Sequence, residues 1–196
     1  MMKKSLIVTI IVCVLLCGNT CYAAAAGDTY PGTASDATYE EDDATVSVDG
    51  YDILIIPGAP AEVYCNIANN MKKAEKLALR EDPNSDLYIL AHLINGEAGG
   101  ATYVCDTTCY YVGSVVLNRV ASDMFPDTIA DVAFQSGQYA CTWDGNYDKP
   151  MLERSWLIAE DLLENGSVLP EGVVWQAGFT QGSNVYDVID GVYFCY

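Results

Sequence analysis

The chain has 196 residues, of which 51% are hydrophobic, and it carries nine basic against 27 acidic side chains, a net charge of −18. So acidic a protein repels nucleic-acid phosphates, which argues against a nucleic-acid partner and against charge-driven binding to anionic lipids or wall polymers. One histidine and no Cys-x-x-Cys pair argue against a zinc site, and the sequence predicts no other metal and no cofactor.

The N-terminus has the features of a secretory signal peptide. Lys3 and Lys4 precede the apolar residues 6–16, and small residues typical of a signal-peptidase site follow. We expect a signal peptide over residues 1–23, a secreted mature protein, and no stable membrane insertion after cleavage. The apolar stretch is short for a membrane span, although retention of the segment as an anchor stays open.

The next segment, residues 24–50, is rich in Asp, Glu, Thr, Ala and Gly and lacks a pattern of apolar residues that could pack. This composition predicts a disordered acidic tether. The composition changes at Tyr51, and residues 51–196 are long enough for one folded domain with its own core.

Three of the eight cysteines lie in the predicted signal peptide, which leaves Cys65, Cys105, Cys109, Cys141 and Cys195. In an oxidising exterior these favour disulfides, with one thiol left over. Cys105 and Cys109 are close enough along the chain to bond to each other or to Cys141, and the sequence does not choose between these pairings.

The first elements of the folded part are a short strand and two helices. Residues 51–58 predict a strand ended by a Pro-Gly pair, and residues 71–82 predict a helix that Pro83 stops. In residues 85–100, Ser85 can cap a second helix, whose apolar face is formed by Leu87, Leu90, Ala91, Ile94 and Ala98. His92 falls on the polar side of this helix, so we expect it at the surface.

Two further helices and a group of strands complete the predicted domain. Residues 107–122 are apolar almost all round and predict a buried central helix, with a strand as the competing reading. Residues 149–166 predict a helix with Pro150 in its first turn. Residues 172–196 contain short β-branched and aromatic runs, with Asp190-Gly191 as a hairpin turn. The predicted fold is mainly α (α+β), with a small antiparallel β element near the C-terminus.

Glu97 is the candidate for chemistry in this pattern. A helical wheel places it beside Leu90, on the flank of the apolar face and within the last turn of its helix. Desolvation and the unpaired helix carbonyls both penalise the charged form, so we expect a carboxyl group that holds its proton, as a general acid must. Cleavage of glycosidic bonds is a common use of such an acid. The alternative is a solvated or ion-paired glutamate, with Arg119 as its partner.

Four motifs in this order resemble the SleB-type cell-wall hydrolases, the catalytic-domain family of spore-cortex-lytic enzymes. They are INGEA at 94–98, GSVVLNRV at 113–120, FPDTI at 125–129, and Gln135 followed by GQY at 137–139. The resemblance covers residues 86–196. It implies a lysozyme-like, mostly helical domain of a wall-associated enzyme that acts on peptidoglycan glycan strands.

The resemblance also implies a mechanism. Lytic transglycosylases of this kind cleave the β-1,4 bond between N-acetylmuramic acid and N-acetylglucosamine with a single glutamate, which corresponds here to Glu97. The family often reads EARGE, whereas Ala98, Gly99, Gly100 and Ala101 follow Glu97 in this chain. This departure leaves open whether the outcome is transglycosylation or hydrolysis. The alternative function is a noncatalytic glycan- or wall-binding module on the same fold.

Several polar and aromatic residues are candidates for binding a glycan. Gln138 and Tyr139 follow a glycine in a predicted loop, where an exposed tyrosine can stack on a sugar, although core packing is an equal alternative for Tyr139. Trp143 is a similar candidate. Gln176 and Gln181 could line a polar groove for N-acetyl groups.

A structural role is favoured for Asn118 and Arg119, which lie in the predicted buried helix and must be satisfied internally, holding the floor of a cleft or orienting Glu97. If the enzyme hydrolyses by an inverting route, a second carboxylate must lie across the cleft. The candidates for it are Asp106, Asp144 and Asp148.

Overall fold

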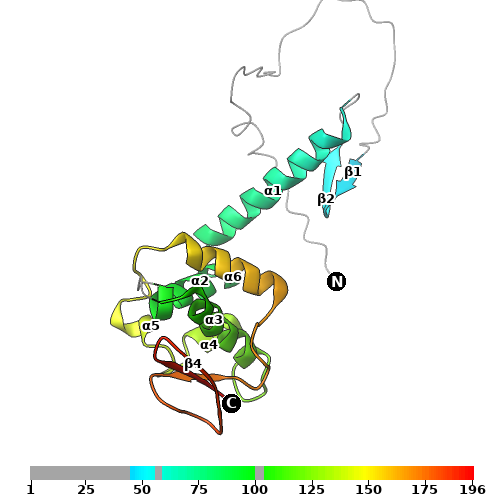
Figure 1. Cartoon of the computed structure of the whole chain (residues 1–196). Helices are drawn as coiled ribbons and strands as arrows, with labels where there is room; N and C mark the ends of the chain where they lie inside the picture. The colour runs from blue at the N-terminus through cyan, green and yellow to red at the C-terminus, as the bar shows by residue number, and fades with distance from the viewer. Residues whose placement is uncertain (1–44, 56–58, 100–103) are drawn as a thin grey trace, which may run out of the picture. The chain divides into compact units, whose positions relative to one another are not determined.

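The computed structural model describes residues 45–55, 59–99 and 104–196, which all belong to one compact unit, Asp43–Tyr196. The described ranges form five strands and seven helices, and Figure 1 shows how they are arranged. They are β1 (Thr45–Val48), β2 (Tyr51–Leu54), α1 (Ala61–Glu81), α2 (Asp86–Ile94), the π-helix η1 (Asn95–Gly99), α3 (Asp106–Val120), α4 (Ile129–Ala133), α5 (Cys141–Asp144), α6 (Glu153–Asn165), β3 (Trp175–Ala177), β4 (Val185–Ile189) and β5 (Val192–Cys195).

The core is formed by α2 and α3, with α6 and α4 packed against them (Figure 1). Every residue of α2 from Ile89 to Ile94 is buried, and α3 buries Val112, Val115 and Val116. The predicted central helix is therefore confirmed. Gly113 lets the helices approach, because a Cβ there would lie 2.4 Å from Leu162 Cδ1 on α6.

The start of α2 follows the sequence prediction. The Ser85 hydroxyl oxygen accepts a hydrogen bond from the backbone N–H of Tyr88 at 3.0 Å, as an N-cap does. His92 differs from its prediction as a surface residue. Its side chain is only 7% exposed, stacks on Tyr88 with ring centroids 3.9 Å apart, and lies 2.8 Å through Nδ1 from the carbonyl oxygen of Tyr147. The aromatic neighbours cover a position that the helical wheel assigns to solvent.

A small antiparallel sheet of order β3-β5-β4 ends the chain. Its hairpin turns at Asp190-Gly191, where both residues have positive φ, as predicted for a tight turn. Asp190 Oδ2 accepts hydrogen bonds from Thr108 Oγ1 at 2.6 Å and from the backbone N–H of Cys105 at 2.9 Å. These bonds lower the pKa of Asp190 and tie the hairpin to the start of α3. A mainly helical domain with a C-terminal antiparallel β element is thus confirmed.

The N-terminal part of the described chain differs from prediction in two places. The antiparallel hairpin β1–β2 begins at Thr45, inside the range predicted as a tether, and α1 begins ten residues before the predicted helix. The two elements pack together: α1 contacts both strands, Lys72 Nζ lies 2.9 Å from Asp49 Oδ2, and the Tyr51 hydroxyl donates a hydrogen bond to Glu75. The predicted signal peptide and the rest of the predicted tether lie outside the described residues.

The five cysteines of the described part are all free thiols, in contrast to the predicted disulfides. Cys109, Cys141 and Cys195 are buried, whereas Cys65 and Cys105 are exposed. Cys105 and Cys109 lie on either side of the first turn of α3, where the exposed Cys105 Sγ instead contacts Thr108 Oγ1 at 3.4 Å.

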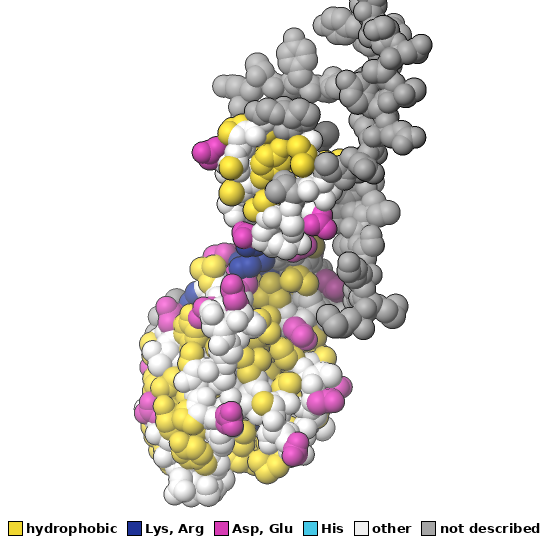
Figure 2. Space-filling model, turned by 90° about the vertical axis from the view of Figure 1, so that its right-hand side faces the viewer, with side chains coloured by type: hydrophobic (Ala, Val, Ile, Leu, Met, Phe, Trp, Pro, Cys, Tyr) yellow, Lys and Arg dark blue, Asp and Glu magenta, His cyan; other side chains and the backbone are white. Residues whose placement is uncertain are grey.

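No helix within the described ranges is long and apolar enough to span a bilayer. Figure 2 shows acidic side chains scattered singly over the face turned to the viewer. Such a distribution of charge favours solubility rather than one anionic binding patch.

Candidate active site around Glu97

Glu97 lies in η1, the π-helical turn that continues α2. Short π-helical turns occur often at functional sites because they re-aim side chains that a regular helix would direct elsewhere. The side chain is half-buried, at the margin of the core as the wheel predicted. Its Oε1 accepts a hydrogen bond of 2.9 Å from the backbone N–H of Cys141. One carboxyl oxygen is thereby fixed by the protein backbone.

Cys141 is the first residue of α5, and the turn Tyr139–Thr142 that contains it, called the Cys141 loop below, packs against η1. A Cβ on Gly96 would lie 2.6 Å from Cys141 Cβ and 3.3 Å from the carbonyl oxygen of Asn146. Glycine at position 96 is therefore a condition for the hydrogen bond to Glu97. Burial raises the pKa of the Cys141 thiol, and the charge of Glu97 and a hydrogen bond to it raise that pKa further.

Asn95 anchors the first residue of η1 to the start of α6. Its Oδ1 accepts hydrogen bonds from the backbone N–H of Leu152 at 3.2 Å and from Ser155 Oγ at 3.1 Å, and its Nδ2 donates to the carbonyl oxygen of Pro150 at 3.4 Å. Asn95 is 1% exposed. The turn that presents Glu97 is thus held from both sides, by α6 and by the Cys141 loop.

Tyr139 and Arg119 are both buried and contact each other, with Arg119 Cζ 5.1 Å from the Tyr139 ring centroid. Tyr139 is completely buried, so its ring offers no open face for a sugar. Of the two roles predicted for Tyr139, core packing is therefore the one that fits its position. Burial raises the pKa of its hydroxyl, opposed by the charge of Arg119 and reinforced by that of Glu97. Arg119 does not pair with Glu97 or with any other carboxylate in the described ranges. Its Nε donates to the carbonyl oxygen of Val174 at 2.7 Å.

The structure does not join the other predicted binding residues to Glu97 by any hydrogen bond within the described ranges. Gln138 is half-buried and precedes Tyr139, and its backbone N–H donates to the carbonyl oxygen of Gln135. Gln176 lies in β3 with a buried Oε1 that has no hydrogen-bond partner in the described part of the chain. Gln181 is half-buried between β3 and β4. Trp143 on α5, two residues after Cys141, is 60% exposed.

The three candidate second carboxylates are exposed. Asp144 is the last residue of α5, three residues after Cys141, and its charge raises the pKa of the Cys141 thiol as that of Glu97 does. Its two oxygens accept hydrogen bonds from the backbone N–H and the side-chain Nδ2 of Asn146, at 2.8 and 2.7 Å. Asp106 Oδ1 lies 3.6 Å from Arg154 Nη1.

Sequence reasoning missed Asn95, Gly96 and the backbone of Cys141 as parts of the site. A signal was present for two of them. A glycine directly before Glu97 indicates a close approach of another segment, and an asparagine on an apolar helix requires internal hydrogen bonds. The sequence indicates a role for Cys141 only through its sulfur, whereas in the structure its backbone N–H donates to Glu97.

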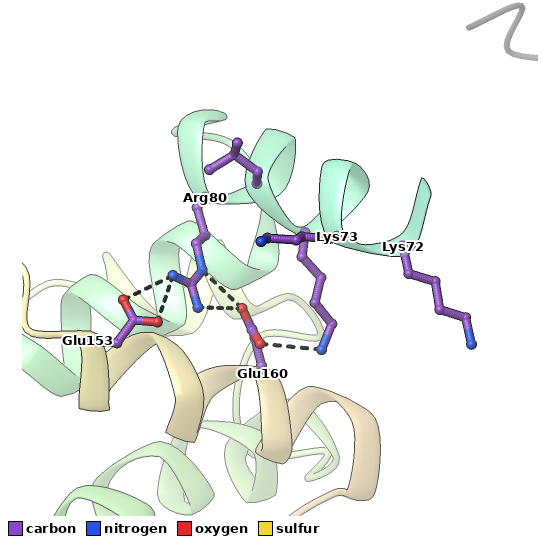
Figure 3. A pocket seen from close by; sticks show the side chains of 7 residues that line it. Lys72, Lys73, Arg80, Glu153 and Glu160 are labelled. Atoms are coloured by element: carbon purple, nitrogen blue, oxygen red, sulfur yellow. Dashed lines mark hydrogen bonds and ion pairs between the residues drawn. The ribbon is translucent and has the colours of Figure 1, made fainter. Parts of the chain in front are cut away.

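A pocket lies elsewhere, between α1 and α6 (Figure 3). The residues that line it are Lys72, Lys73, Lys76, Leu77, Arg80, Glu153 and Glu160. Arg80 Nη1 contacts Glu153 at 3.0 Å, and Arg80 Nη2 contacts Glu160 at 2.8 Å. None of the predicted site residues lines this pocket. In the described ranges no group of three or more His, Cys, Asp or Glu side chains is placed to hold a metal ion.

Comparison with known proteins shows a similarity over part of the domain. Residues 106–176 match the family model described as Cell Wall Hydrolase. The chain is 34% identical over 61 residues to a spore cortex-lytic enzyme of Oceanobacillus iheyensis, an alignment that covers 31% of this chain and 21% of that protein. The chain therefore spans about a fifth of the length of that curated relative. The family match confirms the resemblance to cell-wall hydrolases predicted from the motifs.

Two solved structures are also similar. The first is the catalytic domain of the germination-specific lytic transglycosylase SleB from Bacillus anthracis, with 21% identity, a TM-score of 0.46 and coverage of 57% of this chain and 93% of that one. The second is the catalytic domain of the Bacillus cereus SleB protein, with 21% identity, a TM-score of 0.47 and coverage of 57% of this chain and 89% of that one. The matched family range begins after Glu97, so the role of this residue is argued from its surroundings.

Proposed function

We propose that the protein is a secreted, wall-associated enzyme that cleaves peptidoglycan at the β-1,4 bond between N-acetylmuramic acid and N-acetylglucosamine. Glu97 is its catalytic residue and acts as the general acid. The observation that carries this proposal is the fixed, half-buried carboxyl group of Glu97, with Oε1 held by the backbone N–H of Cys141 at 2.9 Å. Since this bond occupies Oε1, we assign delivery of the proton to Oε2.

The proposed reaction is a lytic transglycosylation. Glu97 gives its proton to the glycosidic oxygen as the bond from that oxygen to C1 of the muramic residue breaks. The 6-hydroxyl oxygen of the same residue then bonds to C1, and its proton returns to the Glu97 carboxylate. The 1,6-anhydro ring forms without a water molecule, so the reaction needs no second carboxylate. Asp144, with both of its oxygens bonded to Asn146, fits a structural role better than that of a base.

The proposed glycan contacts come from the segment that precedes and follows Cys141 and from the C-terminal sheet. The exposed ring of Trp143 is the stacking platform that we assign to a sugar face. Gln138, Gln176 and Gln181 supply amide groups suited to the N-acetyl substituents. Tyr139 supports the site from beneath rather than through a stacked sugar.

The test is release of soluble fragments from purified peptidoglycan by the wild-type chain, Glu97→Gln and Glu97→Asp. Glu97→Gln keeps the shape and the acceptor for the Cys141 N–H but carries no acidic proton, so we expect a loss of about 100-fold or more. Glu164→Gln, an exposed glutamate on α6, is the matched control and should retain wild-type activity. Equal activity of Glu97→Gln and the control would contradict the proposal. Binding of peptidoglycan without any fragments from the wild type would support the noncatalytic module instead.

A further inference from the structure

Arg119 is a buried cation whose position packing alone does not explain. Its side chain is 2% exposed at the end of α3, and no carboxylate within the described ranges lies at ion-pair distance. Burial lowers its pKa, and Nη1 has no hydrogen-bond partner in the described part of the chain. An unpaired buried charge costs several kcal/mol, whereas an apolar side chain of similar volume would fill the same space without this cost. The contacts of the guanidinium group must therefore explain why a charged side chain is buried at this position.

Three aromatic rings surround this guanidinium group. Arg119 Cζ lies 4.9 Å from the ring centroid of Phe125, 5.1 Å from that of Tyr139 and 5.6 Å from that of Trp175. Cation–π contacts are strongest where water is excluded, as it is here. The Nε bond to the Val174 carbonyl oxygen fixes the direction of the group. Arg119 thereby holds the Tyr139 ring in one place.

The backbone of Tyr139 begins the turn whose Cys141 N–H donates a hydrogen bond to Glu97. Its carbonyl oxygen accepts hydrogen bonds from the Thr142 backbone N–H at 3.2 Å and from Thr142 Oγ1 at 2.9 Å, which close a turn. The Cys141 N–H that donates to Glu97 Oε1 lies within this turn. A displacement of the Tyr139 ring therefore moves the donor that fixes the Glu97 carboxyl group.

We infer that Arg119 is a positioning residue for Glu97, acting through the Tyr139 ring and the Tyr139–Thr142 turn. The inference rests on the proposed function, because the positioned group is the proposed general acid. A displacement of a catalytic group by about 1 Å can cost 100-fold in rate. Loss of Arg119 should therefore lower kcat rather than weaken the binding of glycan.

Asn118 provides a matched control. It is adjacent on α3, 4% exposed, and bonded through Nδ2 to the carbonyl oxygens of Pro170 at 2.8 Å and Val173 at 3.0 Å. It anchors the same segment that Arg119 Nε anchors at Val174, but it makes no hydrogen bond or ring contact with the Tyr139–Thr142 turn. Asn118→Ala removes comparable buried hydrogen bonds without disturbing the proposed route to Glu97.

The experiment compares Arg119→Met, Arg119→Lys and Asn118→Ala with the wild type and Glu97→Gln, all as the full chain and below the melting temperature of each. The two readouts are kcat and KM on soluble peptidoglycan strands and the NMR chemical shift of the Cys141 backbone amide. We expect Arg119→Met to lower kcat about 100-fold with KM within about twofold, and to move the Cys141 amide signal. Arg119→Lys should give intermediate values of both. Asn118→Ala should melt earlier but keep kcat within about threefold and the amide signal unchanged.

Two outcomes separate the possible failures. Arg119 variants that lower kcat only in step with melting temperature, as Asn118→Ala does, and that leave the Cys141 amide signal at its wild-type position, would overturn the positioning role. If Arg119→Met does not fold, the Arg119→Lys amide signal decides in the same way. Full activity of Glu97→Gln would instead overturn the proposed function, and the amide signal would still report whether Arg119 positions Glu97.

Discussion

Gly96 and Cys141 approach each other so closely that a methyl group on Gly96 would lie 2.6 Å from Cys141 Cβ. This contact brings the Cys141 backbone N–H within 2.9 Å of Glu97 Oε1. The loop of Cys141 and the π-helical turn thus form one unit, and the absence of a side chain at position 96 sets their separation.

Gly96→Ala should therefore impair the site as well as the fold. The added methyl group must push the Cys141 loop away, at a cost of about 1–3 kcal/mol in the free energy of unfolding. The longer distance from Cys141 N to Glu97 should lower kcat at least tenfold. Gly178→Ala is the control, because a Cβ there meets nothing within 4 Å. The two variants are compared by urea unfolding and by fragment release. Equal kcat values for both would show that the close approach is unimportant for activity.

Asn95→Ala tests the other anchor of the same turn. It leaves the Leu152 N–H and the Ser155 hydroxyl without their buried acceptor, which should cost about 1–3 kcal/mol in the free energy of unfolding. Asn165→Ala removes an exposed bond to Asp161 and should cost less than 1 kcal/mol. Denaturant unfolding measures both. A loss for Asn95→Ala no greater than for Asn165→Ala would mean that the anchor contributes little.

The sequence predicts well those features that depend on residues close together along the chain, and poorly those that depend on contacts between distant segments. The Ser85 cap, the buried α3 and the Asp190-Gly191 turn depend on neighbours along the chain, and all three are confirmed. The π-helical turn and the four-residue α5 are too short to have a periodic pattern. Each is shaped by contacts between distant segments, such as that of Cys141 with Glu97.

Arg119 illustrates the same limit for the candidate site. The sequence places it on a buried helix and predicts an internal partner, with Glu97 as one candidate. The structure gives it aromatic rings and a carbonyl oxygen instead, from residues 125, 139, 174 and 175. No local pattern encodes a cage whose members come from three separate places along the chain. Glu97 itself could be chosen from sequence because its wheel position and the motif around it are local.

Arg80 joins the end of α1 to α6 through ion pairs. Its loss should increase local opening of α1 without unfolding the core. Its guanidinium group bonds Glu153 and Glu160 and lies 5.3 Å from the Trp156 ring centroid. Because these groups are partly solvated, Arg80→Ala should cost about 1 kcal/mol, less at high salt. Faster amide exchange over residues 72–81 is the measurement. Lys73→Ala is the control, since Lys73 makes no ion pair within the described ranges. Identical amide exchange rates in both variants would contradict the role of Arg80 in holding α1 against α6.

Stability should fall with alkali through the buried Cys109 thiol. Burial raises its pKa from 9.0 to about 11, so the folded chain keeps the proton that the unfolded chain loses. This stabilising contribution is complete below pH 9 and declines as the pH rises towards 11. The difference in unfolding free energy between wild type and Cys109→Ala, measured by urea titration from pH 7 to 10, should shrink above pH 9. A difference independent of pH would contradict the prediction.

The most direct test of a single-acid mechanism at Glu97 is mass spectrometry of the fragments released from peptidoglycan in oxygen-18 water. If Glu97 both gives and recovers the proton, every newly formed muramic end is a 1,6-anhydro residue without the heavy isotope, and Glu97→Gln releases none. Labelled reducing ends from the wild type, or the same anhydro fragments from Glu97→Gln, would contradict the account.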